Sequence, residues 1–199
     1  MFVKVCGLST TEAVLAAVDA GADALGFVLT RSPREVAPDR VRELLSAVPA
    51  GLPAVGVFRH EAAADAVAVA RDAGLDWVQL HGDRTPGDVR TVHDAGLKII
   101  RAVTMSAARE AFADWGEELL LIDAAVPGSG EAWNYASVHA LGLEGRDWLL
   151  AGGLDPENVA GAAAAAGAWG VDVSSGVEQS RGVKDLAKIR DFVRAAKGL

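Results

Sequence analysis

One stretch of the sequence, GRDWLLAGGLDP at residues 145–156, shows how this chain is built. It runs from a glycine typical of a helix end, through a short apolar run that begins at Trp148, to a pair of glycines. An aspartate and a proline follow, and this order is typical of the start of a new helix. The stretch therefore predicts a helix end, a buried strand, a tight turn and another helix start in quick succession.

The same pattern recurs along the chain. Segments rich in alanine and leucine end at glycines that are followed by short apolar runs, namely Gly21, Gly51, Gly74, Gly96, Gly116, Gly145 and Gly167. A further predicted strand, Phe2 to Cys6, opens the sequence. The runs are nearly continuous rather than alternating, as expected of parallel strands that are buried on both faces. Eight strands that alternate with helical segments therefore predict an α/β fold.

Two α/β architectures fit this alternation of strands and helices. A doubly wound open sheet would show the same alternation. Eight near-equal units without an insertion or linker favour a (β/α)8 TIM barrel, and we expect residues 1–199 to form a single domain. Two helix starts are also predicted: Ser9 and Glu12 have the spacing of a capping box, and Asp155 precedes Pro156 as an N-cap precedes a proline at the first helical position.

Composition excludes several classes of partner. The chain of 199 residues has 19 basic and 27 acidic residues, a net charge of −8, which disfavours broad attraction to nucleic acid or to an anionic membrane. The longest uncharged apolar run, 159–171, is too short for a membrane span. The first residues show neither a basic leader nor a cleavable apolar segment, so we expect a cytoplasmic protein. Any anionic ligand must be held by local groups.

Cysteine and histidine usage argues against a metal centre. The chain has one cysteine, Cys6, and four scattered histidines without a partner at ligand spacing. We therefore expect no metal and no cofactor, and a small molecule as the partner. The sequence leaves open whether the chain is a monomer or a homodimer.

Polar residues at the carboxyl ends of the predicted strands are the candidate site, because barrel enzymes place their active sites at that end. These strand ends contribute Cys6, Arg34, Arg59, His81, Arg101, Asp123, Gly152, Gly153, Asp172, Ser174, Ser175 and Gly176. The glycines and serines after the last two strands predict a phosphate site, since glycine allows backbone N–H groups to approach an anion closely. The alternative is that they only form tight turns.

The strand ends together resemble one known family, phosphoribosylanthranilate isomerase, a barrel enzyme of the tryptophan pathway. The resemblance spans the whole chain and depends on six motifs in order: Lys4 to Leu8; Ser32-Pro33-Arg34; Gly56-Val57-Phe58; Gln79 to Gly82; Leu150 to Leu154 with Pro156, Asn158 and Val159; and Val171 to Glu178 with Gly182, Lys184 and Asp185. Each motif alone would be weak evidence. All six motifs occur in the same order and each lies at the end of a predicted strand, so the match is not explained by coincidence.

The resemblance implies an Amadori rearrangement of N-(5-phosphoribosyl)anthranilate to 1-(2-carboxyphenylamino)-1-deoxyribulose 5-phosphate. It implies Cys6 as the general base and Asp123 as the general acid. It also implies Arg34 as a clamp for the anthranilate carboxylate, which suits a planar guanidinium. His81 and Asp172 would line the pocket and contact the substrate. Other readings stay open: Cys6 as a buried apolar residue, Asp123 as a helix cap, Arg34 as a solvated arginine, His81 as a structural residue, and Asp172 as an internal partner of Lys4.

Simple electrostatics predicts how the two proposed catalytic groups would work. A free thiol is mostly protonated at neutral pH, so a base role for Cys6 requires a nearby positive charge. Lys4 points to the same side of its strand, and we expect it to lie beneath the thiol and favour its ionised form. Asp123 follows a strongly apolar strand, and burial there would raise its pKa and keep it protonated.

The sequence departs from the family pattern at two positions, and two rival functions stay open. Pro127 stands where the family has a glycine in a loop that precedes Trp133 and Tyr135, and it would stiffen that loop. Arg59 adds a positive charge near the entrance. The histidine-pathway phosphoribosyl isomerase shares the barrel, but it resembles two half-barrel repeats with an acidic residue where Cys6 stands. A phosphosugar-binding barrel without turnover is the rival outside the enzymes.

Overall fold

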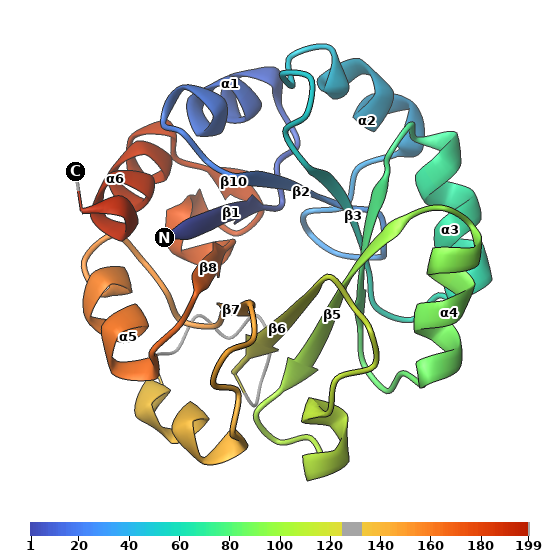
Figure 1. Ribbon diagram of the computed structural model, residues 1–199. Coiled ribbons are helices and arrows are strands. Elements are labelled where there is room, and N and C mark those ends of the chain that lie inside the picture. Colours follow the sequence, from blue (N-terminus) through green and yellow to red (C-terminus); the bar gives the residue numbers. More distant parts are fainter. Residues whose placement is uncertain (125–132, 199) are drawn as a thin grey trace.

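The strands form a closed barrel. The computed structural model describes residues 1–124 and 133–198. Parallel strands follow one another around the barrel in chain order, as Figure 1 shows: β1 (Phe2–Cys6), β2 (Ala24–Val28), β3 (Ala54–Phe58), β4 (Trp77–His81), β5 (Lys98–Thr104), β6 (Leu119–Asp123), β7 (Trp148–Leu150) and β8 (Gly170–Val173). The TIM barrel prediction is confirmed.

Pairing between the first and last strands closes the sheet. β1 lies parallel to β8, with Lys4 opposite Asp172 and Val5 opposite Val173. An open doubly wound sheet has no such pairing, so that alternative is wrong. Closure also places residues from the two ends of the chain in one wall of the barrel.

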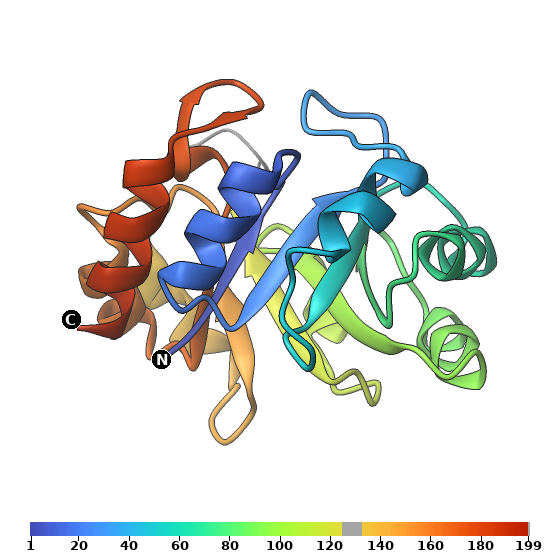
Figure 2. The same ribbon diagram turned by 90° about the horizontal axis from the view of Figure 1, so that it is seen from above.

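Helices form the outer layer of the barrel (Figure 2). They are α1 (Thr11–Asp19), α2 (Pro38–Leu45), α3 (Ala63–Asp72), α4 (Pro86–Asp94), α5 (Val159–Ala166) and α6 (Leu186–Lys197), with the 3₁₀ helices η1 (Arg109–Phe112), η2 (Tyr135–Leu141) and η3 (Ser175–Val177) and the short strands β9 (Glu178–Ser180) and β10 (Val183–Lys184). Within the described residues, no helix is long and apolar enough to cross a membrane.

The connections after β5 and β6 differ from the others because their helical segments are 3₁₀ helices. After β5, the buried Arg101 donates hydrogen bonds to the carbonyl oxygens of Ala111 and Ala113, and its guanidinium stacks on Trp115 at 3.9 Å. Carbonyl groups that a longer helix would pair internally are satisfied here by a side chain. Arg101 therefore packs outside the barrel and is not part of the strand-end site.

All seven predicted glycine stops have positive φ angles between 64° and 90°, but only four of them end a helix. Gly21, Gly74 and Gly96 directly follow the C-caps of α1, α3 and α4, and Gly167 is the C-cap of α5. For the other three the prediction is wrong, because α2, η1 and η2 are capped earlier, at Ser46, Ala113 and Gly142.

One predicted helix start is wrong by a residue: the side chain of Thr10, not Ser9, accepts the N–H of Ala13 at 3.2 Å. Asp155 does accept the N–H groups of Glu157 and Asn158, but the α-helix itself begins later, at Val159. The Asp-Pro pair therefore caps a turn that leads into α5.

The barrel interior is apolar toward the amino ends of the strands and lined by polar residues at their carboxyl ends. The lower layers are a buried cluster of Val55, Ile100, Ala102, Leu119, Leu121, Leu149 and Ala151. A smaller buried cluster of Cys6, Val28 and Val57 lies at the carboxyl ends of β1, β2 and β3. Gly26 makes room for the thiol, since a Cβ there would lie 2.8 Å from the sulfur of Cys6. The packed lower layers support a cavity at the upper end.

Candidate active site

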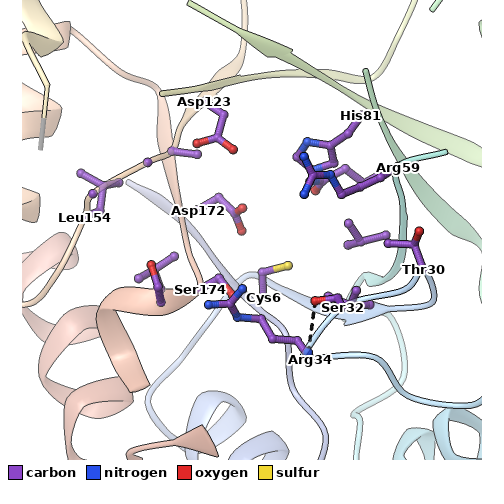
Figure 3. A pocket seen from close by; sticks show the side chains of 18 residues that line it. Cys6, Thr30, Ser32, Arg34, Arg59, His81, Asp123, Leu154, Asp172 and Ser174 are labelled. Carbon is purple, nitrogen blue, oxygen red and sulfur yellow. Dashed lines mark hydrogen bonds between the residues drawn. The ribbon is translucent and has the colours of Figure 1, made fainter. Parts of the chain in front are cut away.

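A cavity at the carboxyl ends of the strands brings together most of the predicted site (Figure 3). Its lining includes Cys6, Arg34, His81, Asp123, Gly152, Gly153, Asp172, Ser174 and Ser175, together with Thr30, Ser32, Arg59, Gln79 and several apolar residues. Gly176 is the predicted site residue outside this lining. A Cβ at Gly176 would lie 1.8 Å from the carbonyl oxygen of Leu154, so close packing of the last two strand-end loops requires glycine there.

Cys6 ends β1 in a buried, charged environment. Its side chain points into the cavity (Figure 3), and the residue is 6% exposed. Lys4 lies one pleat below and donates to Asp172 at 2.8 Å, so the internal Lys4–Asp172 pair exists and Asp172 also lines the cavity. Burial opposes the charged form of Lys4, but Asp172 and Cys6 hold its pKa above the ordinary value. Lys4 is therefore a permanent positive charge inside the barrel.

The pKa of Cys6 is raised, whereas the sequence-based expectation was that Lys4 would favour the ionised thiol. Burial raises the pKa of the Cys6 thiol and outweighs Lys4 and Lys184, which lower it, while Asp172 raises it further. Lys4 thus acts in the predicted direction, but the pKa of Cys6 still lies above its usual value. A strand pattern predicts that Lys4 is near Cys6, whereas the balance between burial and charge requires coordinates.

Asp123 ends β6 as a buried carboxyl group. Burial raises its pKa to about 6, Asp172 adds to this effect, and the N–H of Ala124, which donates to Oδ1 at 2.8 Å, opposes it. The raised pKa agrees in direction with the expectation that burial after the apolar strand would keep Asp123 protonated. Gly152 packs directly on this group, since a Cβ there would lie 2.8 Å from Oδ1 of Asp123. Asp123 is thus prepared to carry a proton near neutral pH.

His81 ends β4 as a neutral ring. Burial, followed by the charges of Lys4, Arg59 and Arg84, lowers its pKa to about 3. Gln79 Nε2 donates to His81 Nε2 at 2.6 Å, which requires the ring proton to be on Nδ1. Figure 3 shows Arg59 beside His81 on the same wall. His81 therefore offers a hydrogen-bonding ring rather than a charge to the cavity.

Arg34 makes contacts that the sequence did not reveal. Its Nε and Nη2 donate to the two carboxylate oxygens of Glu178 at 2.6 and 3.0 Å. Its backbone N–H donates to Ser32 Oγ at 3.1 Å, the dashed line in Figure 3. One edge of the guanidinium is thus occupied by Glu178. The edge formed by Nη1 and Nη2 is the one left for a ligand in the cavity.

The loops after β7 and β8 form the wall where phosphate was predicted. Gly152 and Gly153 have φ angles of 83° and 67°, conformations that favour glycine. Asn158 Nδ2 donates to the carbonyl of Gly153 at 2.8 Å and fixes this turn. Across from it, the carbonyl of Ser174 accepts a hydrogen bond from Lys184 at 2.7 Å.

Two aromatic side chains hold the same loop from the other side. The indole N–H of Trp133 and the hydroxyl of Tyr135 donate to the carbonyl of Gly152, both at 3.2 Å. The predicted effect of Pro127 lies outside the described residues. Across the described chain, no group of three or more His, Cys, Asp or Glu side chains is arranged to hold a metal ion.

Comparisons with known proteins identify the family of this chain. The family model of N-(5′-phosphoribosyl)anthranilate isomerase matches residues 3–195. An N-(5′-phosphoribosyl)anthranilate isomerase from Trichlorobacter lovleyi is 40% identical over 98% of this chain and 97% of its own.

Two solved structures show the same likeness. The phosphoribosyl anthranilate isomerase from Thermus thermophilus has a TM-score of 0.91 and 35% identity over 100% of this chain and 99% of its own. A solved phosphoribosyl anthranilate isomerase in complex with reduced 1-(o-carboxyphenylamino)-1-deoxyribulose 5-phosphate has a TM-score of 0.88 and 34% identity over 100% of both chains. The resemblance predicted from the strand-end motifs is confirmed, and this chain belongs to the N-(5′-phosphoribosyl)anthranilate isomerase family.

Proposed function

We propose that this chain converts N-(5-phosphoribosyl)anthranilate to 1-(2-carboxyphenylamino)-1-deoxyribulose 5-phosphate by an Amadori rearrangement in tryptophan biosynthesis. The observation that carries the proposal is the placement of one thiol and one carboxyl group, Cys6 and Asp123, on different strands around a single cavity (Figure 3). Such a pair can give a proton to one atom of a sugar and take a proton from another.

In the first step, Asp123 is the general acid. Its carboxyl proton passes to the furanose ring oxygen as the bond between that oxygen and C1′ breaks. The nitrogen lone pair forms a C1′–N double bond, and Asp123 is left ionised. The raised pKa of Asp123, about 6, supports this role because a fraction of the carboxyl is protonated near neutral pH.

In the second step, the Cys6 thiolate is the general base. It removes the proton from C2′, the electrons of that C–H bond form a C1′–C2′ double bond, and the C1′–N bond becomes single. The resulting enolamine tautomerises to the ketone product. Lys4 and Lys184 support this step because both favour the ionised thiol.

Substrate binding is assigned to the surrounding groups. Arg34 takes the anthranilate carboxylate, and the loops with Gly152, Gly153, Ser174 and Ser175 take the phosphate, while Gly176 keeps two of these loops in contact. His81 and Asp172, which line the same cavity, are assigned hydrogen bonds to the sugar. No cofactor takes part in this scheme.

The test follows the fluorescence of phosphoribosylanthranilate during turnover, with a Cys6→Ala/Asp123→Asn double variant as the inactive control. Loss of signal with wild type but not with the double variant is the expected result. A wild type that binds the reduced product analogue but never consumes substrate would instead be a binding protein. The histidine-pathway substrate, assayed in parallel, shows whether a second isomerase activity is present.

A further inference from the structure

A buried ionic cluster joins the two loops that face the anionic ends of the proposed substrate. The cluster consists of Arg34 after β2, Ser174 after β8, and Glu178 and Lys184 in the β9–β10 hairpin. Glu178 accepts from Arg34 at 2.6 and 3.0 Å, from Lys184 at 3.1 Å and from the N–H of Gly182 at 3.1 Å. The Glu178 and Lys184 side chains are only 5% and 2% exposed.

Lys184 links Glu178 to Ser174 in the predicted phosphate loop. Its ammonium donates to the carbonyl and, at 3.3 Å, to the hydroxyl of Ser174 while it also pairs with Glu178. Glu178 therefore touches Arg34 directly and Ser174 through one intermediary. A carboxylate so held stays ionised: burial acts to raise its pKa, but Arg34, Lys184 and the N–H of Gly182 together lower it.

Close backbone packing keeps the cluster compact. A Cβ at Gly7 would lie 2.9 Å from Cδ of Arg34 and 3.0 Å from Oγ of Ser174, and a Cβ at Gly182 would lie 2.5 Å from the carbonyl oxygen of Pro33. Glycines at these two positions thus let β1 and the hairpin approach the Arg34 loop. Figure 3 shows the Arg34 side chain extending past Cys6 toward Ser174.

We propose that Glu178 is a positioning residue for substrate binding, which fixes the free edge of the Arg34 guanidinium at a set separation from the Ser174 loop. The inference rests on the proposed function, because the aryl carboxylate and the phosphate are the two anions to be placed. Glu178 occupies the Nε–Nη2 edge of Arg34, so the Nη1–Nη2 edge faces the ligand. Without Glu178, Arg34 keeps its charge but loses the contact that orients it.

The fold contains a matched control. Glu117, whose side chain is 1% exposed, accepts from Arg101 at 2.6 Å, from Arg146 at 2.8 Å and from the N–H of Trp115 at 3.0 Å. It is thus a buried carboxylate with two cationic partners and one backbone donor, as Glu178 is, but it is not part of the cavity lining. A purely structural effect of losing such a carboxylate would be the same at both positions.

The experiment measures kcat and KM for phosphoribosylanthranilate, and Kd for the reduced product analogue, in wild type, Glu178→Gln, Glu178→Asp and Glu117→Gln. We expect Glu178→Gln to raise KM and Kd by about tenfold or more, the loss typical of one charged hydrogen bond, with kcat within about threefold of wild type. Glu178→Asp should recover part of this loss. Glu117→Gln should lower the melting temperature without changing KM.

An Arg34→Lys background tests whether Glu178 acts through Arg34. Adding Glu178→Gln there should raise KM by less than it does in wild type, because the oriented guanidinium is already gone. If Glu178→Gln changes KM no more than Glu117→Gln does, the inference is wrong. If Glu178→Gln does not fold, Glu178→Asp decides in its place, and an unchanged KM there also overturns the inference. If wild type does not consume the substrate, it is the proposed function that fails.

Discussion

Burial acts in the same direction on Cys6 and Asp123, which lie on two different walls of the cavity, but it helps one proposed role and hinders the other. Both groups are at least nine-tenths buried, and burial is the largest cause of the raised pKa of each. For Asp123, a raised pKa produces the protonated form that an acid needs. For Cys6, a raised pKa hinders the ionised form that a base needs.

Charged neighbours are distributed accordingly. Lys4, Lys184 and Asp172 all influence Cys6, and the first two favour its thiolate. Among the described residues, Asp123 accepts one hydrogen bond, from the N–H of Ala124, and burial is the largest cause of its raised pKa. Burial thus raises the pKa of the acid in the direction that its role requires, with Asp172 adding to it, whereas a buried base needs compensating cations.

Removal of either group tests the comparison most severely. Cys6→Ala and Asp123→Asn should each lower kcat by a factor of about 10² to 10⁴, the range for loss of general acid–base catalysis. Steady-state turnover measures this loss, and calorimetry with the reduced product analogue serves as the control, with Kd within about threefold. Either variant turning over near the wild-type rate would remove that residue from the mechanism.

Burial of Asp123 should also cost stability. Its pKa is raised from 3.8 to about 6, so the unfolded chain loses this proton first as the pH rises, and the penalty grows until about pH 6 and then stays constant. Two pKa units correspond to about 3 kcal/mol as an upper limit. We therefore expect Asp123→Asn to raise the free energy of unfolding above pH 6 by up to this amount.

Urea unfolding of wild type and Asp123→Asn at pH 4 and pH 8 measures this effect. The gain should be large at pH 8 and small at pH 4, where Asp123 is protonated in the folded protein. An equal increase in the free energy of unfolding at both pH values would show that burial of the ionised Asp123 carboxylate does not destabilise the folded protein.

The cations around Cys6 provide a more moderate test. Lys4→Met removes a charge that lowers the pKa of Cys6, whereas Asp172→Asn removes one that raises it. The pH midpoint of Cys6 alkylation should therefore move up in the first variant and down in the second. Iodoacetamide labelling reports on this thiol alone because the chain has one cysteine. Midpoints that move together, or not at all, would contradict the proposed role of Lys4.

The smallest expected effect belongs to Arg59. Its charge lowers the pKa of Asp123, but the side chain is exposed and therefore screened by solvent. Arg59→Gln should raise the pKa of Asp123 slightly and change kcat/KM at pH 7 by less than about twofold. A change of more than tenfold would show that Arg59 contacts the substrate directly.

Much of the barrel could be predicted from the sequence because its signals are local. Gly21 and Gly74 mark helix ends through their own backbone conformation, and the apolar runs that follow them are long enough to show the strands. The 3₁₀ segment after β5 was missed because Arg101 replaces helical hydrogen bonds with contacts that no local pattern records. Thr10 and Ser9 are equally good caps by composition, so geometry had to choose between them.

In the site, too, features with a local sequence signal could be predicted, whereas features that depend on distant contacts could not. Cys6 and Asp123 follow strands and could be named from motifs, and the proximity of Lys4 to Cys6 follows from strand alternation. Glu178 contacts Arg34 across 144 positions of sequence, and this pairing exists only after the barrel closes. The pKa of Cys6 depends on several distant charges and on burial, and neither can be summed from sequence.

The pH dependence of kcat/KM tests most directly whether a protonated Asp123 and an ionised Cys6 act together. Between the two pKa values, the protonated fraction of Asp123 falls as fast as the thiolate fraction rises, so the rate is flat. Below about pH 6, Asp123 stays protonated while the thiolate fraction falls tenfold per pH unit. Above the raised pKa of Cys6, the thiolate is complete and further loss of the Asp123 proton lowers the rate.

We therefore predict a plateau whose acidic limb begins near pH 6 and whose alkaline limb lies above the ordinary thiol pKa, measured by fluorescence at pH values where circular dichroism shows the folded protein. Asp172→Asn should move both limbs to lower pH, because Asp172 raises both pKa values. A wild-type rate that stays constant from pH 7 down to pH 4 would contradict the account, since Asp123 would then titrate as an ordinary exposed carboxyl group.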